Sequence, residues 1–212
     1  MLIQQFHAGI RPGQQLTVAG SGTPLFSRQG HWDGGSTLHC VAMGLALLDK
    51  LADPVALPYH AGGNERRVWD RVWPHYLHGL TLAELASFIA ELNLGVQPVV
   101  CPGPASGILR FISRELSRGR PAIVGWRQSR PVRWHAALAV GVEGRRDERT
   151  FLPNALLLVD PAGDEPGMAG FNARLDWHEP ESIRYRSCRA RQVVTIEGAV
   201  SMRPLVSASA DA

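Results

Sequence analysis

The chain has 212 residues, 45% of them hydrophobic and 19% charged, with a formal net charge of +3 at pH 7. These values are typical of one soluble globular domain, and so small and dispersed a positive charge argues against nucleic-acid binding. No apolar run approaches the roughly 18 residues of a membrane span, and the N-terminus lacks the features of a signal peptide. Three cysteines without a CxxC pair fit a reducing compartment, so we expect a cytoplasmic protein.

The first elements expected along the chain are two short strands and a core helix. Residues 2–6 and 15–19 are strand-like, and the turn signal Pro12-Gly13 separates them. Residues 36–51 predict a helix that is apolar on nearly every face. A helix of that kind belongs in the core of a protein.

Three more helices and a strand are expected before the middle of the chain. Residues 64–78 and 81–93 predict helices, the second opening with a capping-box spacing. Residues 94–101 predict a strand that a Pro-Gly-Pro turn ends. Residues 106–118 predict a further helix, on which arginines recur every fourth position; they form either a solvated face or a docking site for an acidic protein partner.

The C-terminal half changes to β-type patterns. Its β-branched or alternating runs predict strands at residues 121–126, 134–142, 154–160 and 191–202. Helices followed by an antiparallel sheet indicate the α+β class. We expect one domain over residues 1–206 and a disordered tail at 207–212.

Candidate catalytic residues lie at the ends of these elements. Ser36 follows two glycines at the start of the core helix, where free N–H groups and the positive end of the helix dipole point outward. His135 opens one apolar strand and Asp160 ends another. Neighbouring strands would place the Asp160 carboxylate beside His135, where it could fix the tautomer of the imidazole. Gln29 is a candidate donor to an oxyanion hole.

The ordered set of Gln29-Gly-x-x-Asp33-Gly-x-Ser36, an apolar helix, His135 and Val159-Asp160-Pro161 resembles the papain-like cysteine peptidases that process double-glycine leader peptides of bacteriocins, and more closely their bacterial relatives. The resemblance implies a papain-like α+β fold. In it, a helical N-terminal half with a buried core helix packs on a C-terminal antiparallel sheet, and the site lies in the cleft between them.

The resemblance also implies roles for the four residues. Ser36 would hold the nucleophile position, His135 would be the general base, Asp160 the orienting acid and Gln29 the oxyanion donor. The chain departs from the family pattern in having serine where the family has cysteine. It also has Thr37 where the family usually has glycine, and a slightly longer spacing between Gln29 and the nucleophile position.

Several interpretations of Ser36 stay open. It could be a substituted catalytic cysteine, the native residue of a pseudoenzyme that binds peptides without cutting them, or a working serine nucleophile. The last interpretation has the weakest chemical support, because a hydroxyl cannot form the thiolate on which a Cys–His pair depends. Serine is also a preferred N-cap, so Ser36 could be purely structural. Cys40, one turn deeper in the same helix, is expected to be inert core.

Aromatic and metal-binding patterns complete the expectations. Trp32 and Trp134 could form walls of a groove for an extended peptide, although core packing is the default for tryptophans. The eight histidines match no complete metal-ligand pattern, and no nucleotide-binding motif occurs, so we expect neither metal nor cofactor. The sequence therefore predicts a cysteine-type peptidase that acts on a peptide or protein substrate. The alternatives are a non-catalytic peptide-binding module and an acyl transferase.

Overall fold

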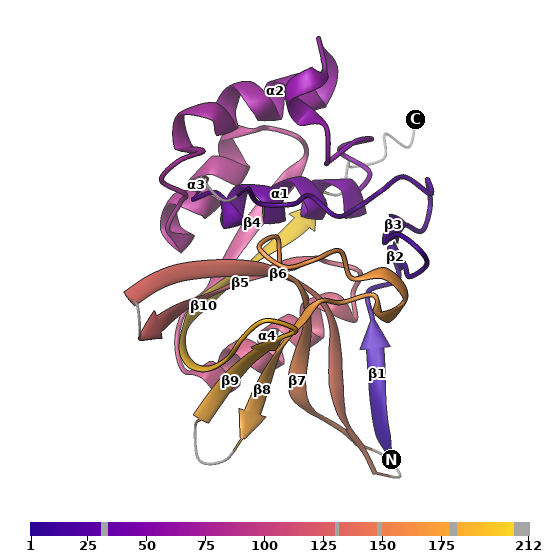
Figure 1. Cartoon of the computed structure of the whole chain (residues 1–212), viewed down its shortest axis with the longest axis vertical. Coiled ribbons are helices and arrows are strands. Elements are labelled where there is room, and N and C mark those ends of the chain that lie inside the picture. The colour runs from indigo at the N-terminus through magenta and orange to yellow at the C-terminus, as the bar shows by residue number, and fades with distance from the viewer. Residues whose placement is uncertain (31–33, 130–131, 148–149, 179–181, 206–212) are drawn as a thin grey trace, which may run out of the picture.

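The computed structural model describes residues 1–30, 34–129, 132–147, 150–178 and 182–205 (Figure 1). Its α-helices are α1 (Ser36–Leu47), α2 (Gly63–Val72), α3 (Leu82–Glu91) and α4 (Ala105–Leu116), with three short 3₁₀ helices at Leu57–Tyr59 (η1), Trp73–His75 (η2) and Gly167–Ala169 (η3). Its strands are β1 (Leu2–Phe6), β2 (Ile10–Arg11), β3 (Thr17–Val18), β4 (Val96–Cys101), β5 (Ala122–Ser129), β6 (Val132–Arg146), β7 (Phe151–Val159), β8 (Ala173–His178), β9 (Ser182–Ser187) and β10 (Arg191–Pro204).

Six antiparallel strands close into a barrel. The hydrogen-bonded order runs β6-β5-β10-β9-β8-β7, and β7 pairs with β6 again to complete the circle. β1 adds to β6 and β4 adds to β10, which makes eight strands in the sheet among the described residues. Two register shifts interrupt the pairing of β6 with β7. The extra residue is Val140 on β6 at the first shift and Asn154 on β7 at the second, so each strand bends once where the two pair.

The expected papain-like α+β fold is wrong. The structure is mostly β, and its body is the closed barrel with four short helices beside it, rather than a helical half packed on an open sheet. The sequence patterns gave four strands in the C-terminal half but not β8 and β9. These two strands connect β7 to β10, so without them the barrel cannot close.

Most other elements lie where the patterns predict them. α1 is buried along its length except at His39. The capping box of α3 is present, with Thr81 and Glu84 exchanging hydrogen bonds. α2 is shorter than expected because a 3₁₀ turn containing Pro74 follows it. The expected tail at 207–212 lies outside the described residues.

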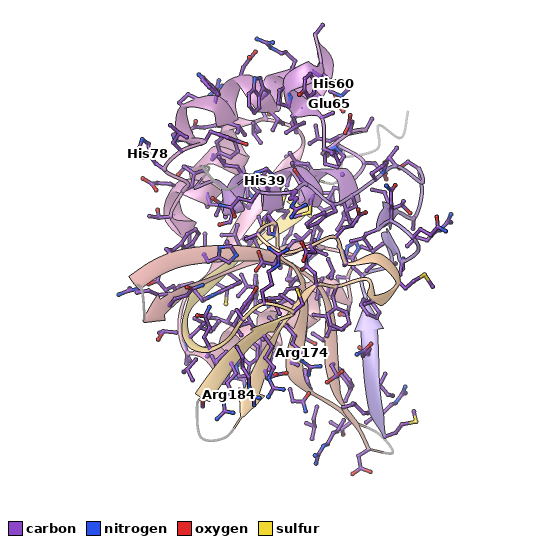
Figure 2. All side chains as sticks on the ribbon, in the orientation of Figure 1. His39, His60, Glu65, His78, Arg174 and Arg184 are labelled. Atoms are coloured by element: carbon purple, nitrogen blue, oxygen red, sulfur yellow. The ribbon has the colours of Figure 1, made fainter. Side chains whose placement is uncertain are left out.

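The helices α1, α2 and α3 form a layer on one side of the barrel (Figure 1). His39, His60 and Glu65 lie in this helical layer, whereas Arg174 and Arg184 lie on the barrel away from it (Figure 2). No helix in the described ranges combines the length and the apolar character that crossing a bilayer requires.

Alternation along β6 divides the interior into two hydrophobic clusters. Ala136, Leu138 and Val140 belong to the cluster that includes α1. Ala137 and Ala139 belong to the other cluster, shared by the barrel strands and α4. Because side chains alternate across a strand, β6 is the wall between the two.

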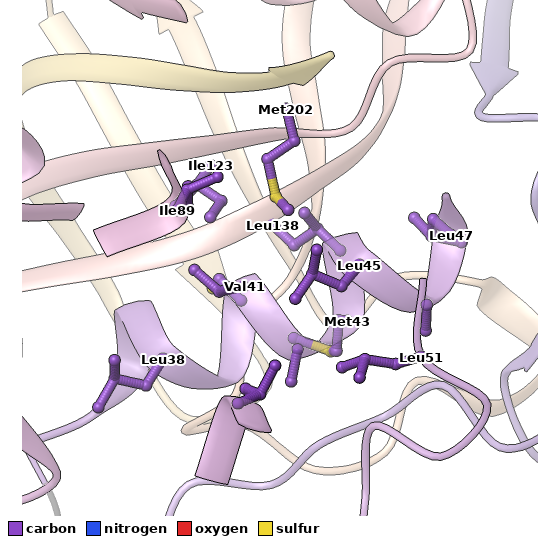
Figure 3. Packing of buried hydrophobic residues seen from close by; sticks show 14 of the residues in the cluster. Leu38, Val41, Met43, Leu45, Leu47, Leu51, Ile89, Ile123, Leu138 and Met202 are labelled. Carbon is purple, nitrogen blue, oxygen red and sulfur yellow. The ribbon is translucent and has the colours of Figure 1, made fainter. Parts of the chain in front are cut away.

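The core helix lies close against the barrel. Figure 3 shows Val41, Leu45 and Leu138 packed together, with Met202 of β10 reaching toward the helix. A Cβ atom on Gly44 would come 2.5 Å from the Met202 sulfur, so a larger residue there would require the Met202 side chain to shift. The close packing fixes where the first residue of α1 lies along β6.

Candidate functional site

Ser36 is the first residue of α1 rather than its N-cap. Gly35 occupies the N-cap position and makes no side-chain capping bond. The Ser36 side chain is buried, and its Oγ accepts a hydrogen bond of 3.3 Å from the backbone N–H of Ala136. The purely structural role of an N-cap serine is therefore not the one that Ser36 has. Its hydroxyl instead lies against β6, one residue from His135.

Backbone contacts hold the turn before Ser36 in place. The Gly34 N–H donates to Tyr76 O, and a Cβ on Gly34 would lie 2.5 Å from Leu77 O. Thr37, at the position where the resemblance led us to expect glycine, is fully buried, and its Oγ1 accepts from the N–H of Leu80. The unusual threonine thus has a structural reason, since it anchors the start of α1 to the segment after η2.

His135 and Asp160 are brought together as the strand order predicts. β6 and β7 are antiparallel neighbours, and His135 Nε2 lies 2.8 Å from Asp160 Oδ1. The His135 side chain is 15% exposed and that of Asp160 only 2%. The carboxylate is thus enclosed, while the imidazole keeps an edge open to solvent.

The second oxygen of Asp160 is bound by a residue that the sequence analysis missed. Tyr185, on β9, donates its hydroxyl to Asp160 Oδ2 at 2.6 Å. The ring of Trp126 lies edge-on to His135, with 5.0 Å between centroids, and 5.3 Å from the ring of Tyr185. The alternation of residues 182–187 was the available signal for Tyr185, because Ile183 and Tyr185 are its inward-facing positions.

Hydrogen bonds from a loop residue also hold the turn after β7 in place. Asn172 accepts from the backbone N–H of Asp160 through Oδ1, at 2.7 Å, and donates through Nδ2 to the backbone oxygens of Asp160 and Asp164. The Ala162 N–H donates to Asp160 Oδ1. No sequence pattern pointed to Asn172, which lies in a loop. Together these contacts leave the Asp160 carboxylate one orientation.

Neighbouring charge and hydrogen bonds determine whether the Asp160 carboxyl group and the Tyr185 hydroxyl are ionised. Burial raises the pKa of Asp160, but the His135 charge and the hydrogen bonds from His135, Tyr185 and Ala162 outweigh burial and lower that pKa overall. Burial and the adjacent Asp160 carboxylate raise the pKa of Tyr185. Tyr185 therefore stays a neutral hydrogen-bond donor, and Asp160 stays an anion beside the imidazole.

Ser36 and His135 are close in the fold but are not hydrogen-bonded in the described structure. The Ser36 hydroxyl contacts the backbone next to His135, at Ala136, and the imidazole contacts Asp160. The N-terminal end of α1 has no acidic residue in its first turn. No acidic side chain of that first turn offsets the positive end of the helix dipole, which favours an anion at position 36.

Cys40 is buried core, as the sequence predicts. The thiol is fully buried, and burial followed by the Asp160 charge raises its pKa well above the ordinary value. A thiol with that pKa is neutral and a poor nucleophile. Although Cys40 lies one turn from Ser36, it does not compete for the nucleophile role.

The structure gives fewer side-chain contacts for the other predicted site residues, Gln29, Trp134 and Trp32. The Gln29 N–H donates to Pro161 O at 2.9 Å, so its backbone lies beside the Asp160 turn, and its oxyanion role stays a prediction. Trp134 is half-buried and packs over Gly125, where a Cβ would lie 2.8 Å from its ring. Trp32 and Asp33 lie outside the described residues. Among the residues that are described, no group of three or more potential metal ligands occurs.

No protein-family model matches this chain, and no curated protein matches it.

Proposed function

We propose that this chain carries a peptidase-type acyl-transfer site, with Ser36 at the nucleophile position, His135 as base and Asp160 as the orienting carboxylate. The observation that supports it best is the hydrogen-bonding contact of 2.8 Å between a partly exposed imidazole and an enclosed carboxylate, beside the start of a buried helix. The proposal rests on this constellation and on the resemblance of its motifs, and not on the fold.

Each residue has a defined part in the proposed reaction. The nucleophile at position 36 attacks the carbonyl carbon of a peptide bond while His135 takes its proton. His135 then gives that proton to the leaving amine, and water releases the acyl group by the reverse sequence. Asp160 stabilises the imidazolium form that exists between these steps. The positive end of α1, with Gln29 as a candidate partner, stabilises the oxyanion.

The second candidate function is peptide binding without cleavage. One observation favours it, namely that the Ser36 Oγ accepts a hydrogen bond from the Ala136 N–H and is not hydrogen-bonded to the imidazole. A serine needs a directly bonded base to become a nucleophile, whereas a thiol ionises beside an imidazolium at a helix start. We therefore expect the serine form to bind peptides with little turnover and the cysteine form to cut them.

The test is the pH dependence of thiol alkylation in Ser36→Cys, measured with iodoacetamide. The native thiols that are not fully buried are first removed by Cys101→Ser and Cys188→Ser. A matched control is Ser106→Cys, which lies in the first turn of α4, a helix of the same length. We expect the thiol at position 36 to be alkylated at pH 6, where that at position 106 is still protonated, and His135→Ala to abolish the difference.

Cleavage of a peptide library by Ser36→Cys, followed by mass spectrometry, then separates the two candidate functions. Cleavage that is lost in the double variant with His135→Ala supports the peptidase site. An ionised thiol with no cleaved product favours the binding module. A thiol at position 36 that ionises no more readily than the one at position 106 contradicts the proposed site altogether.

A further inference from the structure

Arginine side chains line the exposed side of α4 and the turn that ends it. Arg110, Arg114 and Arg118 recur at every fourth position, and all three are exposed. The opposite side of the helix, which includes Ile108 and Ile112, is buried against the barrel strands. Four residues advance an α-helix by about 6 Å, so the three arginines form a row about 12 Å long. We call this row the arginine face.

The rest of the chain provides little negative charge for the arginine face. Among the described residues, no ion pair joins Arg110 or Arg118 to a carboxylate. Arg114 lies 3.9 Å from one, that of the fully buried Glu115. Both oxygens of that carboxylate are already bound by the guanidinium of Arg203, at 2.8 and 2.9 Å. Glu115 therefore holds β10 against α4 and leaves most of the charge of the arginine face unbalanced.

The surroundings of the arginine face are positive as well. Arg120 contacts the Glu115 carboxylate at 3.5 Å, beside Arg203. Glu115 is the one acidic residue in the sequence of α4. Five arginines and one glutamate thus gather here, and their combined charge exceeds the net charge of +3 of the whole chain.

The strands that pack on α4 do not supply the missing carboxylates. These strands are β5, β6, β7 and β10. Their acidic residues are Glu143 and Glu197, and each already pairs with an arginine of the barrel, Arg174 and Arg127 respectively. Within the described chain, these elements therefore offer the arginine face no free carboxylate.

Two arginines of the exposed helix α2, in contrast, have partners within the chain. Arg66 pairs with Asp70 at 2.9 Å, and Arg71 lies 3.6 Å from Glu91 of α3. Like charges four residues apart on a helix repel each other and destabilise it, which is the arrangement on α4. An acidic molecule bound along α4 would relieve this repulsion, because each arginine would then face a carboxylate.

Small polar side chains lie between the arginines. Ser106, Ser113 and Ser117 are spaced seven and four residues apart, which keeps them on the same side of α4 as Arg110. The Ser117 hydroxyl donates to the backbone oxygen of Arg114 at 2.9 Å. Because no large side chain separates the charges, a second helix can lie at the usual interaxial distance of about 8–10 Å.

The arginine face has no exposed aromatic or large apolar residue on its own helix. The exposed aromatic side chains among the described residues are Phe6, Tyr59 and Trp73, which belong to β1, η1 and η2. Proteins that bind single-stranded nucleic acid stack its bases on aromatic side chains, and helices that lie on membranes insert apolar ones. The composition of this surface therefore favours protein carboxylates as its ligands.

We propose that the arginine face binds an acidic helix of a partner protein, whose carboxylates lie four residues apart and meet Arg110, Arg114 and Arg118. Such a helix repeats its side chains at the same spacing of about 6 Å, and a guanidinium takes a carboxylate through two parallel hydrogen bonds. α4 belongs to the hydrophobic cluster on the other side of β6 from α1, and it lies apart from the layer of α1, α2 and α3 (Figure 1). The inference is thus independent of the proposed function.

The test measures binding of a capped, alanine-based helical peptide with glutamate at every fourth position, by isothermal titration calorimetry. One control peptide has glutamine in place of glutamate, and another has the same number of glutamates spread around the helix. We expect the first peptide to bind, to shift the backbone amide NMR signals of residues 105–118, and to lose affinity as the salt concentration rises. The spread isomer should bind several-fold more weakly, and the glutamine peptide should not bind.

Two double variants test whether the arginine face is the site. Arg110→Gln with Arg118→Gln removes two exposed charges that have no ion-pair partner among the described residues, and should weaken binding about tenfold. Arg66→Gln with Arg71→Gln is the matched control, because it removes the same charge from α2, and should change the affinity less than about twofold.

Several results would overturn the proposal. Equal weakening by the two double variants, or equal affinity for the two glutamate isomers, would show attraction to the overall charge rather than a site on α4. A thymidine oligonucleotide or phosphatidylserine vesicles that bind more tightly than the peptide, and release on Arg110→Gln with Arg118→Gln, would assign the arginine face to nucleic acid or to a membrane instead.

Discussion

The barrel carries two buried networks of polar and charged side chains, one beside α1 and one on its outer wall. The first joins His135, Asp160 and Tyr185. In the second, Arg174 of β8 bonds to Glu143 of β6 at 2.7 Å and to Asp176 at 2.6 Å. Gln4 and Arg186 complete this second network.

The two networks differ in the kind of group that faces their carboxylates. In the outer network a guanidinium, which stays charged at any physiological pH, faces two carboxylates that are nearly fully buried. In the network beside α1 the Asp160 carboxylate faces the His135 imidazole and the Tyr185 hydroxyl instead. Burial of charge alone therefore does not mark a functional site. The network beside α1 differs from the outer network in that its imidazole keeps an edge exposed to solvent, next to a helix start.

The largest expected effect is on stability, from Arg174→Met. The change leaves Glu143 and Asp176 buried without their shared partner, and we expect a loss of about 3–5 kcal/mol in the free energy of unfolding. Urea denaturation monitored by circular dichroism measures it. The control is Arg127→Met, because the Arg127–Glu197 pair is exposed on the arginine side and should contribute no more than about 1 kcal/mol. Similar losses from the two variants would contradict the structural role of the outer network.

Tyr185→Phe tests the network beside α1. It removes the hydroxyl that donates to Asp160, and we expect a loss of about 1.5–3 kcal/mol at pH 7. The folded-state pKa of Asp160 is lowered, so its contribution to stability is present above the unfolded-state pKa of about 3.8 and is lost as the pH falls. The difference between native protein and variant should therefore shrink in acid. A difference in unfolding free energy that is the same at pH 7 and pH 3 would be evidence against an ionised Asp160.

The contrast between the two networks also shows what the sequence could predict. The pairing of His135 with Asp160 follows from two apolar strands that are adjacent in sequence and in the sheet. The position of Ser36 follows from a helix that is apolar on all sides. These are local patterns, and each is strong enough to be recognised without the fold.

The closed barrel and Tyr185 could not be predicted in the same way. β8 and β9 carry charged residues such as Arg174 and Asp176 that are buried only because strands far apart in sequence supply their partners. Hydrophobicity alone therefore gives these strands a weak signal. Closure also depends on β6 being much longer than its apolar run and on two register shifts between β6 and β7, which side-chain patterns do not reveal.

Gly34→Ala tests whether backbone contacts, rather than charged groups, hold Ser36 in position. The position of Ser36 depends on main-chain contacts, whereas the outer network depends on charge. A methyl group at Gly34 would lie 2.5 Å from Leu77 O, and we expect a loss of about 1–3 kcal/mol. Gly20→Ala is the matched control, since a Cβ there has no atom within 4 Å. In a Ser36→Cys background, Gly34→Ala should also slow alkylation of the new thiol; unchanged alkylation would show that these contacts do not position the residue.

The smallest expected effect is on the pH dependence of stability and concerns His7, which, unlike His135, has no described contact with a carboxylate. His7 is buried and accepts from the Gly9 N–H, and among the described residues no ion pair joins it to a carboxylate. Burial lowers the pKa of His7. Above its unfolded-state pKa of about 6.5 the imidazole is neutral in both states; below it the unfolded chain takes up the proton first, so stability falls as the pH falls. His7→Asn should reduce this slope of unfolding free energy between pH 7 and pH 5, as measured by urea denaturation. An unchanged slope would mean that burial without a partner carboxylate does not make the stability of this fold depend on the protonation of a histidine.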